Sequence, residues 1–220
     1  MTDIFDEVDE ELRADRAQAL LRRYGWVIIG AALLIVGAAG GWQAWRSWRH
    51  KQDLSIATEY IAATRLADVA GPARATGRPE AIAAFEKVAA HAPEGYRTLA
   101  RLRAAALKAD GGDMEGAAAI WDQVAGDGAA DPLIRDLANV TWANRLLDKG
   151  DPALIEARLK PLTAPDNPWR PLARETEALL SLREGKTQQA KDSFRALAQD
   201  VTAPQGVRTR ANIVMNRLGG

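Results

Sequence analysis

The sequence predicts an all-α protein in which a single N-terminal transmembrane helix is followed by a stack of helical hairpins. Two observations support this class. A long stretch near the N-terminus carries no formal charge, and beyond Lys51 apolar residues recur three and four positions apart with few β-branched runs. We therefore expect an acidic leader helix at 1–23, a transmembrane signal anchor at 24–48 and a helical repeat domain at 52–220.

The composition excludes several classes of function. Among 220 residues, 29 Lys and Arg balance 29 Asp and Glu, so no overall positive field would hold nucleic acid. Cysteine is absent, which excludes iron–sulfur clusters, thiol catalysis and disulfides. The two histidines form no HExxH motif, and no glycine-rich phosphate loop follows a predicted strand. We expect no catalytic residue, no metal, no cofactor and no nucleic-acid partner.

The predicted anchor rests on the charge-free run from Tyr24 to Trp45. As a helix this run would be about 33 Å long, enough to cross a hydrocarbon core of about 30 Å. Basic residues flank the run, and aromatic residues stand where lipid headgroups would lie. These flanking residues are Arg22, Arg23, Arg46, Arg49 and Lys51, with Tyr24, Trp26, Trp42, Trp45 and Trp48. The leader before the run is too long and too acidic for a cleaved signal peptide, so we expect an uncleaved anchor.

Charge alone does not decide the orientation of the anchor, because four basic residues precede it and three follow it closely. A long domain after a span is translocated largely regardless of its own charge, so the simplest topology leaves the leader inside and the repeats outside. The leader is either an amphipathic helix that docks a partner or a solvated extension.

Within the run, three glycines fall near one helix stripe. Gly37 and Gly41 form a GxxxG pair, and Gly30 lies two turns earlier. Such a stripe allows close approach of another helix, whether from a second copy of the chain or from another protein. Glycine is also common in membrane helices without this role, so both interpretations stay open.

The region after the anchor carries an internal repeat of about 36 residues. A large apolar anchor recurs in the second helix of each unit, with a smaller apolar residue four positions earlier. The anchors are Phe85, Trp121, Leu159 and Phe194, preceded by Ala81, Ala117, Ile155 and Ala190. Glycine turns come before the later second helices, each seven residues after an alanine. They are Gly112, Gly150 and Gly185, after Ala105, Ala143 and Ala178. Prolines at the expected helix starts are Pro132, Pro168 and Pro204.

These positions resemble the tetratricopeptide repeat, although Ile155 replaces the usual alanine and the early Trp and Leu-Gly of that repeat are missing. The resemblance implies a right-handed stack of helical hairpins with a concave binding surface. An unrelated helical bundle is the alternative. We expect helices at 53–69, 80–91, 94–110, 113–126, 131–149, 152–163, 168–185, 187–200 and 205–218. The stretch from Gly71 to Pro79 is expected to be the longest loop.

If this register holds, side chains of two first helices point into the concave groove. They are Val140, Asn144 and Leu147 in one unit, and Leu179 and Leu182 in the next. An apolar groove of this kind would suit an extended segment or a helix of a partner protein. The alternatives are that the capping helix around 207–218 fills the groove, or that these are ordinary core positions.

Over its full length the chain resembles the bacterial family that includes the ancillary subunit of the SecYEG translocon. The resemblance is carried by the leader DIFDEVDEELRADRAQALLRRYGW, the apolar run, the WQAWRSWR exit and the degenerate repeats. It implies an inner-membrane protein with its N-terminus in the cytoplasm and its repeats in the periplasm. It also implies SecYEG and a membrane-anchored periplasmic chaperone of the prolyl-isomerase type as partners.

Two other functions fit the same architecture. One is a periplasmic scaffold for envelope assembly or division that is unrelated to export. The other places the activity in the acidic leader, which would dock a cytoplasmic regulator while the repeats sense load outside.

Overall fold

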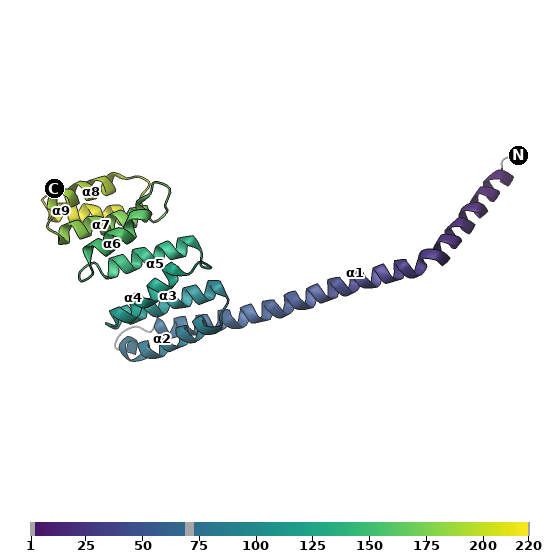
Figure 1. The fold of residues 1–220 in the computed structure, drawn as a ribbon, viewed down its shortest axis with the longest axis horizontal. Helices are drawn as coiled ribbons and strands as arrows, with labels where there is room; N and C mark the ends of the chain where they lie inside the picture. Colours follow the sequence, from purple (N-terminus) through teal and green to yellow (C-terminus); the bar gives the residue numbers. More distant parts are fainter. Residues whose placement is uncertain (1–2, 69–72, 220) are drawn as a thin grey trace. The chain divides into compact units, whose positions relative to one another are not determined.

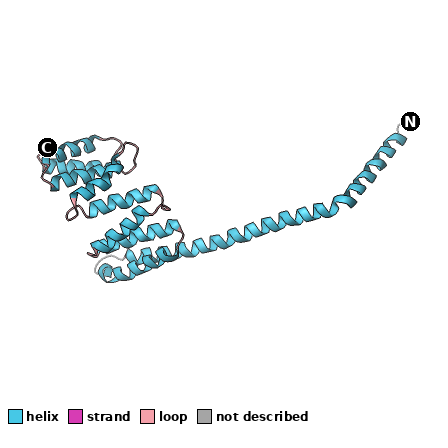
Figure 2. Ribbon diagram, in the orientation of Figure 1, coloured by secondary structure: helices cyan, strands magenta, loops and turns pink. Residues whose placement is uncertain are grey.

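The computed structural model describes the backbone of residues 3–68 and 73–219. Within those ranges, the side chains of residues 3–25, 28, 29, 32, 48–53 and 73–75 lie outside the description. In the part of the chain that is described, all regular structure is helical and no strand occurs (Figure 2). The chain forms two compact units, Met1–Ser55 and Ile56–Gly220. The all-α prediction is confirmed.

The first element is a single helix, α1, which runs without a break over Asp3–Ala67. The sequence led us to expect separate helices for the leader, the anchor and the start of the repeats. No proline occurs between residues 3 and 67, so nothing removes a backbone donor along this stretch. Glycines alone lower helix propensity without ending the helix, and the three expected helices therefore merge.

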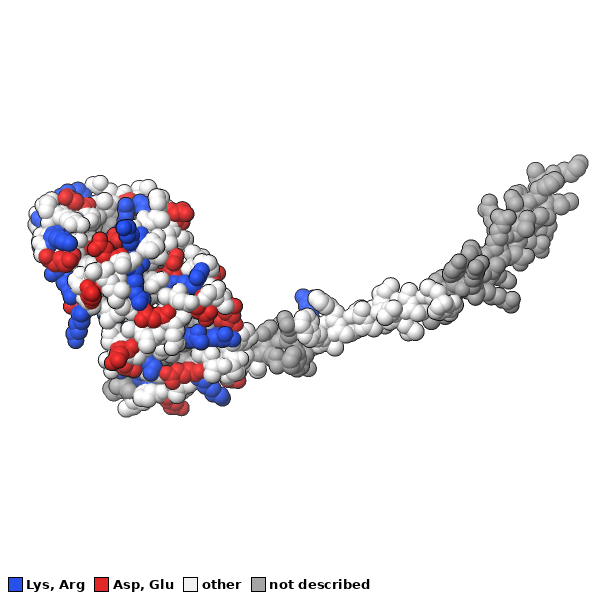
Figure 3. Space-filling model, viewed as in Figure 1, with Lys and Arg blue, Asp and Glu red and all other residues white. Residues whose placement is uncertain are grey.

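The described apolar side chains of α1 in the first unit are exposed, among them Trp26, Leu34 and Trp42. In Figure 3 the described residues of this stretch are almost entirely free of charged atoms. The predicted anchor at 24–48 includes residues 24, 25, 28, 29, 32 and 48, which lie outside the described side chains. Within the described residues, no helix holds an apolar window of the length and hydropathy that a membrane crossing requires.

The second unit is a succession of helical hairpins, shown in Figure 1. After α1 its elements are α2 (Ala73–His91), α3 (Glu94–Asp110), α4 (Met114–Gly126), α5 (Pro132–Arg145), α6 (Pro152–Leu159), the 3-10 helix η1 (Lys160–Thr163), α7 (Arg170–Arg183), α8 (Thr187–Gln199) and α9 (Gln205–Arg217). From α2 to α6 each helix packs on the next, and so do α7, α8 and α9. The end of α1, over Ile56–Ala67, packs with α2 and α3 in one core cluster.

The repeat positions predicted from the sequence form the cores of these hairpins. All four anchors, the four residues that precede them by one turn and the three alanines of the first helices are at most 1% exposed. This burial is what the spacing predicts, since a residue repeated at one position of a stacked hairpin meets the neighbouring hairpin each time. The predicted repeat register is confirmed.

Two helix starts differ from expectation. The stretch expected as a loop up to Pro79 is helical from Ala73, with Pro79 inside α2. The α7 helix begins at Arg170 instead of Pro168, because the Asn167 side chain accepts a hydrogen bond from the Trp169 backbone N–H at 2.8 Å and forms a turn first.

The glycine turns adopt two conformations. Gly112 and Gly185 have φ of +92° and +77°, and the residue after each donates to a carbonyl five positions back, as in a Schellman motif. Gly150 has no positive φ, because α5 ends earlier, at Arg145.

Gly185→Ala is therefore expected to lower the free energy of unfolding by about 1–2 kcal/mol, since alanine in the left-handed region brings its Cβ against the next carbonyl. The matched control is Gly126→Ala, at the end of α4, where an added Cβ meets no atom within 4 Å and φ is not positive. That change should alter stability by less than about 0.5 kcal/mol. Urea unfolding of the full chain, followed by circular dichroism, measures both. Equal losses in the two variants would contradict this account of the turn.

Polar contacts join positions one repeat apart. The Arg183 guanidinium donates to the Leu147 carbonyl at 2.7 Å, and the Trp169 indole donates to the Leu133 carbonyl at 2.9 Å; each pair is separated by 36 residues. The Leu147 carbonyl follows the end of α5, where helix carbonyls lack an intrahelical partner, and the Leu133 carbonyl lies in the first turn of the same helix. These bonds fix the register between neighbouring hairpins, which apolar packing alone specifies less strictly.

Candidate protein-binding grooves

The predicted groove residues of α5 do not share one environment. Val140 is buried in the central core cluster, and Leu147 is partly buried against the same cluster. Asn144 is exposed. Of these three positions, Asn144 is the one whose side chain is accessible to a partner in this structure.

The predicted groove residues of α7, Leu179 and Leu182, are both partly buried. They pack against a core cluster that includes Val207 and Ala211 of α9. The capping helix therefore covers part of this surface, as one of the alternatives from the sequence expected.

The structure brings together a different set of residues, on the side of the second helices. Cavities lie between the second helices of consecutive hairpins, over the intervening first helix. Groove 1 lies between α2 and α4 over α3, and groove 3 lies between α6 and α8 over α7. We call the equivalent place between α4 and α6 over α5 groove 2, where Asp122, Arg158 and Trp142 contact one another.

Equivalent positions in the three grooves follow from the repeat register. The floor position precedes the buried alanine of each first helix by one residue: Ala104, Trp142 and Glu177 in grooves 1, 2 and 3. One wall position precedes each buried anchor by one residue: Ile120, Arg158 and Ser193. The character of each groove follows from these residues.

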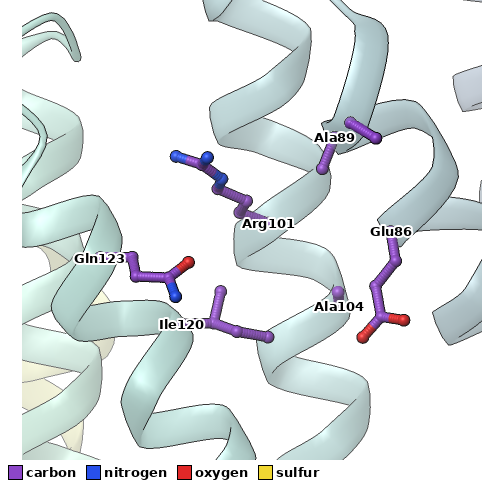
Figure 4. A pocket seen from close by; sticks show the side chains of 7 residues that line it. Glu86, Ala89, Arg101, Ala104, Ile120 and Gln123 are labelled. Atoms are coloured by element: carbon purple, nitrogen blue, oxygen red, sulfur yellow. The ribbon is translucent and has the colours of Figure 1, made fainter.

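Groove 1 is open and largely apolar. It holds a cavity of about 270 Å³ lined by Glu86, Ala89, Ala90, Arg101, Ala104, Ile120 and Gln123. Figure 4 shows Ala104 and Arg101 on the central helix, Ile120 and Gln123 on one side, and Glu86 on the other. A second cavity of about 470 Å³, between α2 and the end of α3, also includes Glu86 in its lining. The two cavities extend the groove along α2.

Charged groups mark both ends of the first cavity. The Arg101 guanidinium pairs with the Asp127 carboxylate at 3.2 Å. The Glu86 carboxylate pairs with Lys108 at 3.3 Å, and the same ammonium group lies 3.6 Å from Asp113. Lys108 is shared between two carboxylates. The Glu86–Lys108 pair is therefore more easily exchanged for another basic group than the Arg101–Asp127 pair.

Groove 2 is closed by its own side chains. The Arg158 guanidinium carbon lies 3.9 Å from the centroid of the Trp142 ring, a cation–π contact. The same guanidinium pairs with Asp122 of α4 at 2.6 Å. Trp142 is 6% exposed and belongs to the central core cluster. An aromatic ring, a guanidinium and a carboxylate thus lie together at this place.

Groove 3 is polar. Two cavities of about 160 Å³ and 560 Å³ share Glu177, Gln189 and Ser193 in their linings. Burial raises the pKa of Glu177; the negative charge of Glu156 raises it further and Arg174 opposes both. The ionised carboxylate of Glu177 therefore destabilises the folded state, since folding favours its protonated form.

Glu177→Gln is expected to raise the urea midpoint at neutral pH, because glutamine removes a half-buried charge. The gain should shrink as the pH falls from neutral through the raised pKa of Glu177. It should be nearly gone at about pH 4, where the wild-type carboxyl is largely protonated in both the folded and the unfolded chain. Glu184→Gln is the control, since the Glu184 carboxylate pairs with Lys186 at 3.1 Å and its loss should leave the midpoint unchanged or lower. An equal rise in both variants would contradict this assignment.

These three grooves were not predicted from the sequence, from which we expected binding residues on the first helices. A signal was present: Ala104, Trp142 and Glu177 stand at one repeat position and differ sharply in size and charge. Ala104 and Trp142 are buried and Glu177 is partly buried, so the residue at this position differs with the side chains that surround it in each groove.

The fold and its grooves define a helical-repeat protein of the kind that binds other proteins on an extended surface. Residues 18–219 match the model of the tetratricopeptide repeat-like domain, and the chain belongs to this family. Repeat domains of this class are generally non-catalytic scaffolds, which suggests protein partners. Comparisons with curated proteins and with solved structures gave no match.

Proposed function

We propose that this protein is a membrane-anchored adaptor that binds partner proteins through its helical repeats. The observation that carries the proposal is the combination, in one chain, of a protein-binding repeat domain with an exposed, charge-free apolar stretch in α1. Apolar side chains such as Leu33, Leu34, Ile35 and Val36 lie exposed in succession around this helix. A helix apolar on all sides needs an apolar surrounding, and a lipid bilayer supplies one.

The family match begins at residue 18 and therefore includes the charge-free stretch together with the repeats. In the proposed topology the protein crosses the bacterial inner membrane once. The leader at 1–23 faces the cytoplasm, and the repeat domain at 52–220 faces the periplasm.

The proposed partners come from the full-length resemblance. They are the SecYEG translocon and a membrane-anchored periplasmic chaperone of the prolyl-isomerase type. In this role the repeats would hold a chaperone, or a newly exported chain, near the exit of the translocon. This role requires no catalytic step, because an adaptor acts by raising the local concentration of its partners.

Copurification tests the function directly. The full chain, tagged at its C-terminus and extracted in mild detergent, should enrich SecYEG and the chaperone relative to an unrelated single-pass membrane protein with the same tag. A variant that lacks residues 2–20 should retain the partners bound by the repeats. Enrichment of envelope-assembly or division proteins without SecYEG would contradict the export role and favour the envelope scaffold.

The predicted residues on the first helices are tested by site-specific photocrosslinking. A crosslinker at Asn144 should trap a partner, and one at Val201, an exposed residue in the turn after α8, should not. Crosslinks at Val201 alone would remove the first-helix surface from the proposal.

A further inference from the structure

We infer that groove 1 docks a segment of a partner protein in which a large apolar side chain, best an aromatic one, stands beside an arginine or lysine. The apolar side chain would lie over Ala104 and against Ile120, and the basic group would reach the Glu86 carboxylate. This inference rests on the protein-binding role proposed above, but it depends neither on the membrane location nor on the translocon.

Groove 2 shows which chemistry satisfies a groove of this shape. There the floor position is Trp142, the wall position is Arg158, and the carboxylate is Asp122 on the preceding second helix. The ring removes the floor from water, the guanidinium covers the ring at 3.9 Å, and the carboxylate neutralises the guanidinium at 2.6 Å. The two charged groups pair with each other, so neither charge is left alone, although the Trp142 indole N–H has no hydrogen-bond partner.

Groove 1 has the same frame with two of the three members missing. Glu86 follows the anchor Phe85 by one residue, just as Asp122 follows Trp121, so the carboxylate is present. The floor position holds Ala104 and the wall position holds Ile120, which supply neither a ring nor a cation. The space that the ring would occupy is the cavity of about 270 Å³.

The charges of groove 1 orient the proposed occupant. The positive end is committed, since Arg101 pairs with Asp127 across the hairpin. At the other end the Glu86 side chain is 50% exposed, and its partner Lys108 also faces Asp113. An incoming basic group can therefore take Glu86 while Lys108 moves fully to Asp113. Charge complementarity favours a basic residue at this end, and the alanines with Ile120 favour an apolar one between the ends.

Groove 3 does not compete for such an occupant. Its floor position is Glu177, and an aromatic ring seated there would desolvate a carboxylate without pairing it. Of the three grooves, groove 1 is therefore the one that suits a segment with an apolar and a basic side chain.

The test uses three fluorescently labelled helical peptides that differ at two positions one turn apart: Trp with Arg, Trp with Glu, and Ala with Arg. Each is titrated with the full chain in nonionic detergent, and binding is followed by fluorescence anisotropy against protein-free micelles. The Trp–Arg peptide should bind about tenfold more tightly than either of the others.

Charge reversal at the groove decides the result. Glu86→Lys, at an exposed site that should not disturb folding, should weaken the Trp–Arg peptide by about tenfold and make the Trp–Glu peptide the better ligand. Ile120→Arg places an arginine at the wall position of groove 1, as Arg158 does in groove 2. This change should also weaken binding of the Trp–Arg peptide. Ala119→Arg adds the same charge on the neighbouring exposed position and should change nothing.

Several results would overturn the inference. They are the absence of saturable binding by the Trp–Arg peptide, equal affinity for the Trp–Arg and Trp–Glu peptides, and an unchanged peptide preference in a folded Glu86→Lys variant. None of these measurements involves a translocon component, so a failure here is distinct from a failure of copurification.

Discussion

Trp121→Ala is expected to lower the free energy of unfolding of the repeat domain by about 3–5 kcal/mol, the largest single effect predicted for this protein. Trp121 is the bulkiest fully buried side chain and lies in the central core cluster, with residues of α3, α5 and α6 around it. Truncation would leave a cavity among these helices. Hairpins packed on both sides hold the helices in place, so they cannot move together to fill the cavity. Urea unfolding of the full chain followed by circular dichroism measures the loss.

The control for Trp121→Ala is Val201→Ala, which truncates a side chain that is 83% exposed in the turn after α8. Its effect should stay within about 0.5 kcal/mol. A loss below about 1 kcal/mol in Trp121→Ala would contradict the assignment of this residue as a core anchor.

Arg210→Ala is expected to have the next largest effect, a loss of about 1–3 kcal/mol. The Arg210 guanidinium holds both carboxylate oxygens of Glu175 at 2.6 Å and so joins α9 to α7. Glu175 is buried, so removal of its partner leaves a carboxylate that is shielded from water and unpaired. The side chain of Arg210 is itself about half exposed, which keeps the loss below that of a fully buried pair.

Two variants separate the pair from its surroundings. Arg195→Ala breaks a surface pair with Asp192 at 2.8 Å and should cost less than about 0.5 kcal/mol. The double variant Arg210→Ala with Glu175→Gln removes the stranded charge and should recover part of the stability that Arg210→Ala loses. Urea midpoints of the full chain test both, and equal costs for Arg195→Ala and Arg210→Ala would show that the bidentate pair has no special weight.

The fold of the repeat domain was largely predictable, because its signal repeats along the chain. Phe85, Trp121, Leu159 and Phe194 occupy one structural position four times, so a spacing near 36 reports the stacking directly. The continuity of α1 was not predictable from the same signal. Propensity and charge mark where the surroundings of a helix change, whereas only proline or turn chemistry marks where a helix ends.

The candidate binding surfaces were harder to predict for a physical reason. Whether a first-helix residue such as Leu179 is open to a partner depends on where the capping helix α9 packs. That packing on α7 is a tertiary contact. Groove occupancy depends on side chains from three helices at once, as in the closure of groove 2 by Trp142, Arg158 and Asp122. No single periodicity contains that arrangement.

The side of the membrane on which the repeats lie is the most direct test of the proposed adaptor. Spheroplasts that carry the full chain with a C-terminal tag are treated with external protease, with a cytoplasmic protein as the marker of intact membranes. We expect the tag to be lost while the marker survives, which would place residues 52–220 in the periplasm. Protection of the tag until the membranes are disrupted would place the repeats in the cytoplasm and contradict the account.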